Sequence, residues 1–213
     1  MAQQERGKRS RRAILEAAAQ VFDERGYDAA STNQILARTR LTRGSLYHHF
    51  PSKEAIALAV IEAHAEALGS PEQPIRVQSV IDLTLQFAQG LQHDPVLRAA
   101  VRLTVEQTSL SCPPETAYEQ SRTAITELLG QAAERGELLP GVDVQEAAAT
   151  VVGCFTGLQI MSHAYSERQD LLERIGVFWR FMLPGLVIPG LIGRLRTTPP
   201  PAPAPTPESS LEA

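Results

Sequence analysis

Three short amphipathic stretches follow one another within about fifty residues at the start of the chain, and none is long enough to be a stable helix alone in water. The first begins near Ser10, and the other two begin at residues 31–32 and at Thr42, where the residue types are those that cap helix N-termini. Gly26 is a stop signal for the first stretch and Pro51 for the third. Such stretches must pack on one another. The pattern therefore predicts a three-helix unit of the helix-turn-helix type, whose last helix can enter the major groove of DNA.

Helical periodicity continues through the rest of the chain, and no stretch alternates as a strand would. We expect further helices over residues 53–68, 77–91, 95–108, 116–135, 143–163 and 167–183. The fold class is therefore all-α, with an N-terminal helix-turn-helix domain at residues 8–68 and a larger helical domain at 69–190. Six of the 15 prolines lie in residues 199–207, so 191–213 is expected to be a disordered tail, and 1–9 a flexible arm.

The net charge of −4 conceals an uneven distribution. Residues 1–54 contain ten of the 20 Lys and Arg but only six of the 24 Asp and Glu, a net charge of +4, so the remainder carries −8. A basic first part joined to an acidic body is typical of a polyanion-binding domain, although a basic tail without a partner has the same charge. Two cysteines exclude a disulfide-dense secreted scaffold, and the N-terminus has no apolar signal-peptide run, so we expect a cytoplasmic protein.

Residues 147–166 contain no charged side chain over a length that would span a bilayer. Several polar residues interrupt this stretch, and no basic flank marks an orientation. We expect a buried helix or a subunit interface, and no membrane contact. Gly153 and Gly157, one helical turn apart, favour either close helix approach or space for a ligand.

Residues 22–56, FDERGYDAASTNQILARTRLTRGSLYHHFPSKEAI, resemble the DNA-binding domain of TetR-family transcriptional regulators. These 35 consecutive residues agree with that pattern in order and spacing. The resemblance implies an all-α homodimer with an N-terminal head that reads DNA and a C-terminal body that senses a small molecule. It also implies that the last two helices of each subunit pair into a four-helix bundle. Two-fold symmetry then predicts a pseudo-palindromic double-stranded operator.

The chemistry of individual residues in this region also fits DNA. Arg43 has the donors for a bidentate pair with guanine or for a phosphate, and Gly44 allows close backbone approach. Thr32 and Thr42 lie at helix N-termini, where amides and hydroxyls favour anionic oxygens, although Thr42 also serves as a cap. The predicted DNA-binding residues are Arg6, Lys8, Arg9, Thr32, Thr42, Arg43, Gly44, Ser45, Tyr47, His48 and Lys53. Leu46 and Phe50 are expected in the core.

A second resemblance lies in the body. The segments DPVLRAAVRL at 94–103, ELLPGVD at 137–143 and GCFTGLQ at 153–159 resemble γ-butyrolactone autoregulator receptors within the TetR family. That resemblance implies a repressor that leaves DNA when a lactone-like signal binds, with a role in secondary metabolism. In those receptors a tryptophan near the start of one helix caps the ligand, and Gln120 stands at the matching position here. The alternative is a receptor homologue that senses an antibiotic or another ligand, or none.

A ligand cavity in the body needs mostly apolar walls and a few orienting polar groups. We expect it among the inner faces of the body helices, with Thr156 and Gln159 as polar groups that otherwise bond to the backbone or face a partner subunit. The predicted ligand-binding residues are His64, Phe87, Val101, Val105, Gln120, Ala124, Phe155, Thr156 and Gln159. The sequence shows neither a paired acid–base constellation nor a cofactor loop nor a metal set, so we expect no enzyme and no cofactor.

Overall fold

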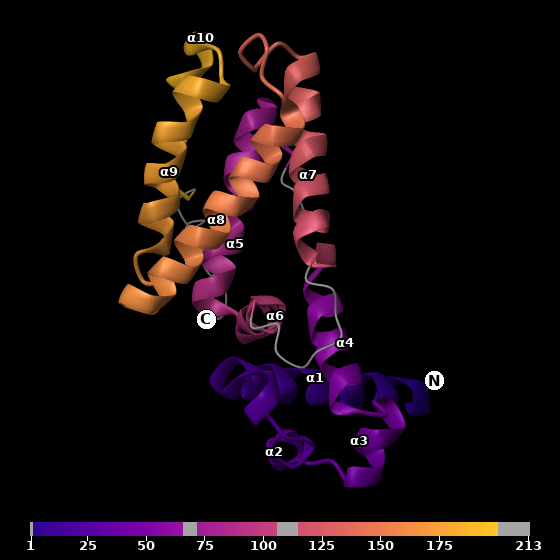
Figure 1. Ribbon diagram of the computed structural model, residues 1–213. Coiled ribbons are helices and arrows are strands. Elements are labelled where there is room, and N and C mark those ends of the chain that lie inside the picture. The colour runs from indigo at the N-terminus through magenta and orange to yellow at the C-terminus, as the bar shows by residue number, and fades with distance from the viewer. Residues whose placement is uncertain (1, 66–71, 106–114, 200–213) are drawn as a thin grey trace, which may run out of the picture.

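The computed structural model describes residues 2–65, 72–105 and 115–199, and within these ranges the chain is helical with no β-strand (Figure 1). The helices are α1 (Ala2–Ala29), α2 (Thr32–Ala37), α3 (Arg43–His49), α4 (Lys53–Ala65), α5 (Arg76–His93), α6 (Pro95–Val105), α7 (Glu115–Glu134), α8 (Val144–Ser166), α9 (Leu171–Leu186) and α10 (Pro189–Ile192). Two parts are visible: a small head containing α1, α2 and α3, from which α4 rises, and a larger helical body. The all-α prediction is confirmed.

In the head, α1 lies across α2 and α3, and the four helices bury one apolar core that includes Phe22, Ile35 and Leu46. Gly26 has a φ of 71°, which turns the chain at the end of α1, at the position where the sequence predicts a stop. Ser31 caps α2 in a reciprocal arrangement with Gln34, because each side chain accepts a hydrogen bond from the backbone N–H of the other. These local signals set the start of α2 and hence the direction in which the chain enters α3.

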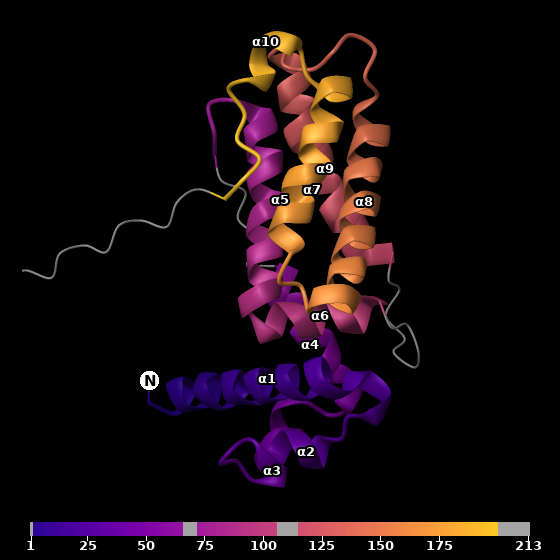
Figure 2. The same cartoon turned by 90° about the vertical axis from the view of Figure 1, so that its left-hand side faces the viewer.

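The body is a bundle in which α5, α7, α8 and α9 stand side by side above the head, and α10 lies at the far end (Figure 2). Its core contains fully buried apolar side chains from all four long helices, among them Leu85, Leu129, Val151 and Trp179. Burial of such side chains removes a large apolar area from water and is the dominant stabilising contribution. The bundle is therefore a rigid frame on which a cavity can be built.

Helix α6 lies between the two parts and belongs to both. Ala99, Ala100 and Leu103 are buried in the core of the head, although α6 follows the first helix of the body in sequence. The Arg98 side chain forms an ion pair with Asp23 of α1, with 2.7 Å between Nε and Oδ2. The head thus rests on α6 through apolar packing and a partly buried ion pair.

The first helix begins earlier than the sequence predicts. Residues 1–9 are expected to be a flexible arm, but α1 already begins at Ala2. Glutamine, glutamate, lysine and arginine dominate this segment, and all are good helix formers. Lys8 also pairs with Glu5 one turn earlier. A polar, charged segment is helical here because it extends a helix that is already nucleated by packing.

The ends of α9 also differ from the prediction. Glu167 and Arg168 have positive φ values of 51° and 69°, so the corner after α8 occupies residues that the sequence assigns to the next helix. At the other end, α9 continues through Pro184 to Leu186 rather than ending at residue 183. Leu183 and Leu186 are buried on either side of this proline, and their packing outweighs the hydrogen bond that proline lacks.

The segment after α10 is not part of a disordered tail as far as residue 199. Gln78 of α5 hydrogen-bonds both backbone groups of Arg196, accepting from its N–H at 2.8 Å and donating to its carbonyl at 3.0 Å. Proline-rich composition excludes a helix, but it does not exclude an extended segment held by tertiary contacts. Residues 200–213, the remainder of the predicted tail, lie outside the described residues.

Candidate DNA-binding face and ligand cavity

Helix α3 projects from the end of the head that is farthest from the body (Figure 1). The Thr42 hydroxyl accepts a hydrogen bond from the Ser45 N–H at 3.3 Å, so the predicted cap is confirmed. Leu46 and Phe50 point inward and are almost fully buried, also as predicted. With the apolar face held in the core, the opposite face of α3 is available to a partner.

Three of the predicted DNA-binding residues interact with one another across this face. The hydroxyls of Thr32 and Tyr47 lie 3.3 Å apart, and the Arg43 guanidinium lies over the Tyr47 ring at 5.7 Å from its centroid. The hydrogen bond from Thr32, and then the contact with Arg43, hold the pKa of Tyr47 below its ordinary value. This arrangement links the N-terminus of α2 to the exposed side of α3.

The rest of the predicted set on α3 faces outward. Arg43, Gly44 and His48 are exposed, and Ser45 is half-buried beside the Thr42 cap. A Cβ at Gly44 would meet no atom of the chain within 4 Å, so no intramolecular contact requires glycine here. The open surface at Gly44 is compatible with close approach of another molecule.

Lys53, whose role as a DNA contact stays a prediction, also has bonds within the head. Its ammonium donates hydrogen bonds to the carbonyls of Tyr27 and Ala30 at 2.8 and 3.1 Å and lies 4.2 Å from the centroid of the Tyr27 ring. These contacts join the start of α4 to the end of α1. Lys53 is a structural residue of the head, because two of its three donors are used within the chain.

The basic residues of α1 lie along the exposed side of its first turns. Arg6, Lys8 and Arg9 are exposed, and Arg11 lies over the Phe50 ring, 5.3 Å from its centroid. The contact with Phe50 places the start of α1 beside the end of α3. Arg11 thus connects the basic N-terminal part of α1 with the C-terminal end of α3.

The body contains a cavity of about 250 Å³. Eight of the nine residues predicted to bind a ligand line it: Phe87, Val101, Val105, Gln120, Ala124, Phe155, Thr156 and Gln159. They come from α5, α6, α7 and α8, which the sequence alone does not place around one space. The side chain of His64, the ninth residue, lies outside the described residues.

Polar groups in the cavity wall are few, and most are already bonded. Thr156 lines the cavity, and its hydroxyl donates to the Val152 carbonyl at 2.9 Å, which leaves the oxygen able to accept a hydrogen bond. Gln159 is 4% exposed, and its Oε1 has no hydrogen-bond partner. Burial raises the pKa of Tyr118 above its ordinary value. The described wall contains no Asp, Glu, Lys, Arg or His, which favours a neutral and largely apolar ligand.

Sequence reasoning missed several residues of the wall, including Leu83, Thr84, Tyr118 and Ser121. Helical spacing would have found them. Leu83 and Thr84 lie one turn before the predicted Phe87, and Ser121 and Tyr118 lie one and two turns before the predicted Ala124. Residues one turn before a cavity residue lie on the same helix face and therefore line the same space.

A separate apolar face lies on the outside of α8 and α9. Its large side chains are exposed: Ile160, Met161, Tyr165 and Phe181. Gly153 and Gly157 are exposed on α8, and a Cβ at either would meet nothing within 4 Å. The last two helices are expected to pair with a second subunit, but not every apolar residue of α9 faces outward: Leu183 is buried in the core of its own chain. Among the described residues, no helix is both long and apolar enough to cross a membrane.

Comparisons with known proteins agree with both parts of the chain. A family model described as bacterial regulatory proteins, tetR family, matches residues 14–60, and a tetracyclin repressor-like C-terminal domain model matches residues 75–188. The chain is 39% identical to the A-factor receptor protein of Streptomyces griseus over 196 residues, which cover 92% of this chain and 70% of that protein.

Two solved structures are similar over nearly the whole chain. The structure of TylP, a TetR regulator from Streptomyces fradiae, has a TM-score of 0.78 at 40% identity and covers 92% of this chain and 87% of that one. A γ-butyrolactone receptor described as ArpA-like has a TM-score of 0.73 at 26% identity, with 89% of this chain and 94% of that one covered.

Proposed function

The chain belongs to the TetR family of bacterial regulatory proteins, and we propose that within it the chain is a transcriptional repressor that a small molecule releases from DNA. The observation that carries this proposal is the cavity: its wall contains eight of the nine predicted ligand-binding residues and also residues of α4 and α6 that pack in the core of the head. In this proposal the protein acts by binding DNA and a small molecule and not by catalysis. Because its target is bacterial DNA, we place it in the cytoplasm.

Helix α3 reads the operator in this proposal. Arg43, Gly44, Ser45 and His48 approach base edges in the major groove, because they occupy the outward face of α3 or its start. Phosphate contacts come from hydroxyls and from the basic start of α1. The proposed phosphate-binding residues are Thr32, Thr42, Tyr47, Arg6, Lys8 and Arg9.

The operator-bound form is a homodimer that pairs through the outer face of α8 and α9. Phe181 is 83% exposed and Tyr165 77% exposed, and side chains of this size are rarely left in water in such number on one face. The exposed glycines of α8 permit close approach of a second helix. A two-fold dimer presents two α3 helices, so the operator is pseudo-palindromic.

The effector is a γ-butyrolactone-like molecule. The uncharged, mostly apolar cavity suits a neutral ring with an alkyl chain, and a solved γ-butyrolactone receptor has the same fold over most of the chain. The sequence resemblance in the body favours the same class. A role in secondary metabolism follows from that class of signal.

The cavity is mechanically connected to the head. Ala100 of α6 lines the cavity and is buried in the core of the head, and Ile61 of α4 lies in the cavity wall. A ligand that prefers a different position of α6 or α4 therefore changes the orientation of the head. The shift requires differential affinity for the two states, as any allosteric effect does.

A second candidate is the same repressor with a different effector. Gln120, which stands where the resemblance leads one to expect a tryptophan, lines the cavity and is exposed. An amide there gives the entrance of the cavity a polar group instead of an indole ring. This favours an effector larger or more polar than an alkyl lactone, such as an antibiotic.

A gel-shift experiment tests the proposal and separates the two candidates. The dimer is mixed with DNA from its own upstream region, with and without a synthetic 2-acyl-γ-butyrolactone. Binding that the lactone abolishes supports a lactone receptor. Binding that persists with the lactone but is abolished by an antibiotic panel supports the second candidate. No binding to this DNA or to selected random duplexes at low salt would contradict the repressor.

A further inference from the structure

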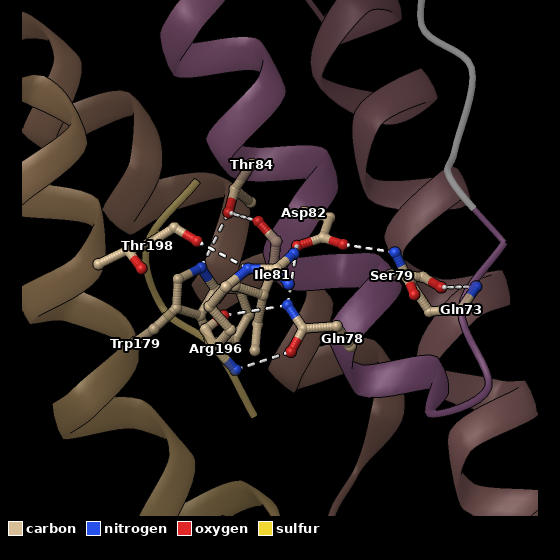
Figure 3. Close-up of polar contacts among 9 residues, drawn as sticks. All are labelled: Gln73, Gln78, Ser79, Ile81, Asp82, Thr84, Trp179, Arg196 and Thr198. Carbon is tan, nitrogen blue, oxygen red and sulfur yellow. Dashed lines mark hydrogen bonds and ion pairs between the residues drawn. The ribbon is translucent and has the colours of Figure 1, made fainter. Parts of the chain in front are cut away.

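The segment after α10, residues 193–199, forms a strap across the body and ends beside α5 and α9 (Figure 3). Both of its central hydrogen bonds run to one side chain: Gln78 accepts from the Arg196 N–H and donates to the Arg196 carbonyl. A glutamine that pairs with both backbone groups of one residue acts as a neighbouring strand would. Gln78 and Arg196 are 118 residues apart in sequence, so the strap is held by tertiary structure alone.

The charged part of the strap reaches a buried carboxylate. Asp82 is 4% exposed, and the Arg196 Nη2 lies 3.1 Å from its Oδ1. The amides of Gln78 and Gln73 also donate to Asp82, at 2.7 and 2.8 Å (Figure 3). A buried carboxylate requires such donors, and Arg196 supplies the only positive charge among these partners.

Helix α9 contains a residue without a side chain where the strap crosses it. Gly176 is buried, and a Cβ there would lie 2.8 Å from the Thr197 carbonyl oxygen. Leu195 packs against the core of the body. The strap therefore has a fitted position on α9 in addition to its polar contacts with α5.

On α5, the polar contacts of the strap lie within two residues of the cavity wall. Thr84, two residues after Asp82 on α5, lines the cavity. Its hydroxyl donates to the Ile81 carbonyl at 2.8 Å and accepts from Trp179 Nε1 of α9, also at 2.8 Å (Figure 3). The same two helices are thus joined twice, by the strap and by the Thr84–Trp179 hydrogen bond.

We propose that Arg196 is a positioning residue for the effector cavity. By holding Asp82 and Gln78, it keeps α5 against α9 and so fixes Thr84, which lines the cavity and accepts the hydrogen bond from Trp179. This inference rests on the proposed function, since it assigns the strap to the ligand-sensing body. Arg196 does not touch the cavity or the head, so its loss changes effector binding while leaving operator binding intact.

The test compares Arg196→Ala with Arg194→Ala, which removes the same charge from an exposed position on the same segment. Trp179 is the only tryptophan of the chain and is fully buried, so its emission reports the joint between α5 and α9 without any effector. We expect a red-shifted emission and greater acrylamide quenching in Arg196→Ala at temperatures well below unfolding. Arg194→Ala and the wild type should be indistinguishable.

The second part of the test measures effector response: the synthetic 2-acyl-γ-butyrolactone is added to the complex of the protein with its operator. We expect Arg196→Ala to need roughly threefold to tenfold more lactone for release, because mutations along a coupling route change effector response by such factors. Operator affinity without lactone should stay within about twofold of the wild type. Arg196→Lys, which retains the charge beside Asp82, should recover part of the response.

A second pair of variants tests the contact between the strap and α9. Gly176→Ala places a methyl group against the Thr197 carbonyl and should reproduce the fluorescence change of Arg196→Ala. Gly185→Ala on the same helix, where a Cβ meets nothing within 4 Å, is the matched control and should leave the emission unchanged.

Two results would overturn the positioning role of Arg196. One is an unchanged Trp179 emission in both Arg196→Ala and Gly176→Ala. The other is a loss of operator affinity that parallels the loss of lactone response, which indicates general destabilisation. A wild-type chain that binds its operator but ignores the lactone contradicts the lactone effector instead, and the fluorescence comparison still decides the role of Arg196.

Discussion

Side chains of the head differ in whether their polar groups are already used within the chain. Arg43 is exposed, and its described contacts are with the Tyr47 side chain next to it on α3. Lys53 donates to two carbonyls, so two of its three N–H donors are used within the head. Two basic residues ten positions apart thus have different roles, and the difference leads to two predictions.

Replacing Arg43 by alanine should weaken operator binding by about 1–3 kcal/mol, which is the cost of losing one specific base contact. Thermal stability should not change, because the side chain is exposed. A gel-shift titration measures the affinity, and Arg194→Ala in the body controls for the change in net charge. Equal affinities of Arg43→Ala and Arg194→Ala would exclude the base contact.

Replacing Lys53 by methionine should lower the free energy of unfolding by about 1–3 kcal/mol. The carbonyls of Tyr27 and Ala30 lose their donor, and the Tyr27 ring loses its cation. Urea denaturation measures the change. A variant of normal stability that binds DNA poorly would instead assign Lys53 to the phosphate backbone.

At the scale of helices, the capping groups come from two sources. Ser31, Thr42 and Asp143 cap their own helices from the preceding residue. The N-terminus of α5 has no such cap, and the Glu137 carboxylate, about sixty residues later, accepts from its first N–H groups at 3.0 Å. A helix end that lacks its own cap is therefore completed by another part of the body.

The corner between α8 and α9 should make stability depend on acid pH. Ser162, Ser166 and Arg174 hydrogen-bond the Asp170 carboxylate and lower its pKa from 3.8 to about 2. The stability that this carboxylate contributes is complete above pH 3.8 and is lost as the pH falls towards 2, because the folded state then binds the proton less readily than the unfolded state.

Asp170→Asn isolates this contribution. Urea midpoints of the wild type and of the variant, measured from pH 5 to pH 2, should differ at pH 5 and converge as the pH falls. A constant difference across this range would show that Asp170 keeps its ordinary pKa in the folded protein.

On the scale of the whole molecule, charge and apolar surface are separated along its length. The part up to residue 54 carries +4 and the remainder −8. The exposed apolar face lies on α8 and α9, away from the DNA-reading α3 (Figure 1). The negative charge of the body is repelled by DNA phosphates, while the positive charge of the head is attracted to them.

Replacing Phe181 by glutamate should convert the dimer to a monomer, since Phe181 is the most exposed large apolar side chain of that face. Operator affinity should fall by roughly a hundredfold or more, because two linked heads bind with avidity that one head lacks. Analytical ultracentrifugation measures the mass. The unfolding of the isolated subunit should be unaffected, and a variant that sediments as a dimer would place the interface elsewhere.

Much of the cavity wall, and which residues of α3 are buried or exposed, could be predicted because helix faces repeat every three or four residues. Phe87, Ala124 and Phe155 were each found from the apolar pattern of their own helices together with the family resemblance, and they meet in one wall. The bonds of Lys53 to two carbonyls could not be predicted, because a sequence shows that a residue is charged but not which carbonyl lies beside it. The continuation of α9 past Pro184 could not be predicted, because it depends on the burial of neighbouring residues, which is a tertiary property.

The sequence by itself determined the helical class, the helix caps and the two-part charge distribution, because capping and amphipathic spacing act within one turn of helix. Only the tertiary structure decided that Ala100 belongs both to the cavity and to the core of the head, and that Arg196 returns to Asp82. These contacts join residues far apart in sequence. The free energy of such contacts depends on the geometry of the packed bundle, so no local sequence pattern predicts them.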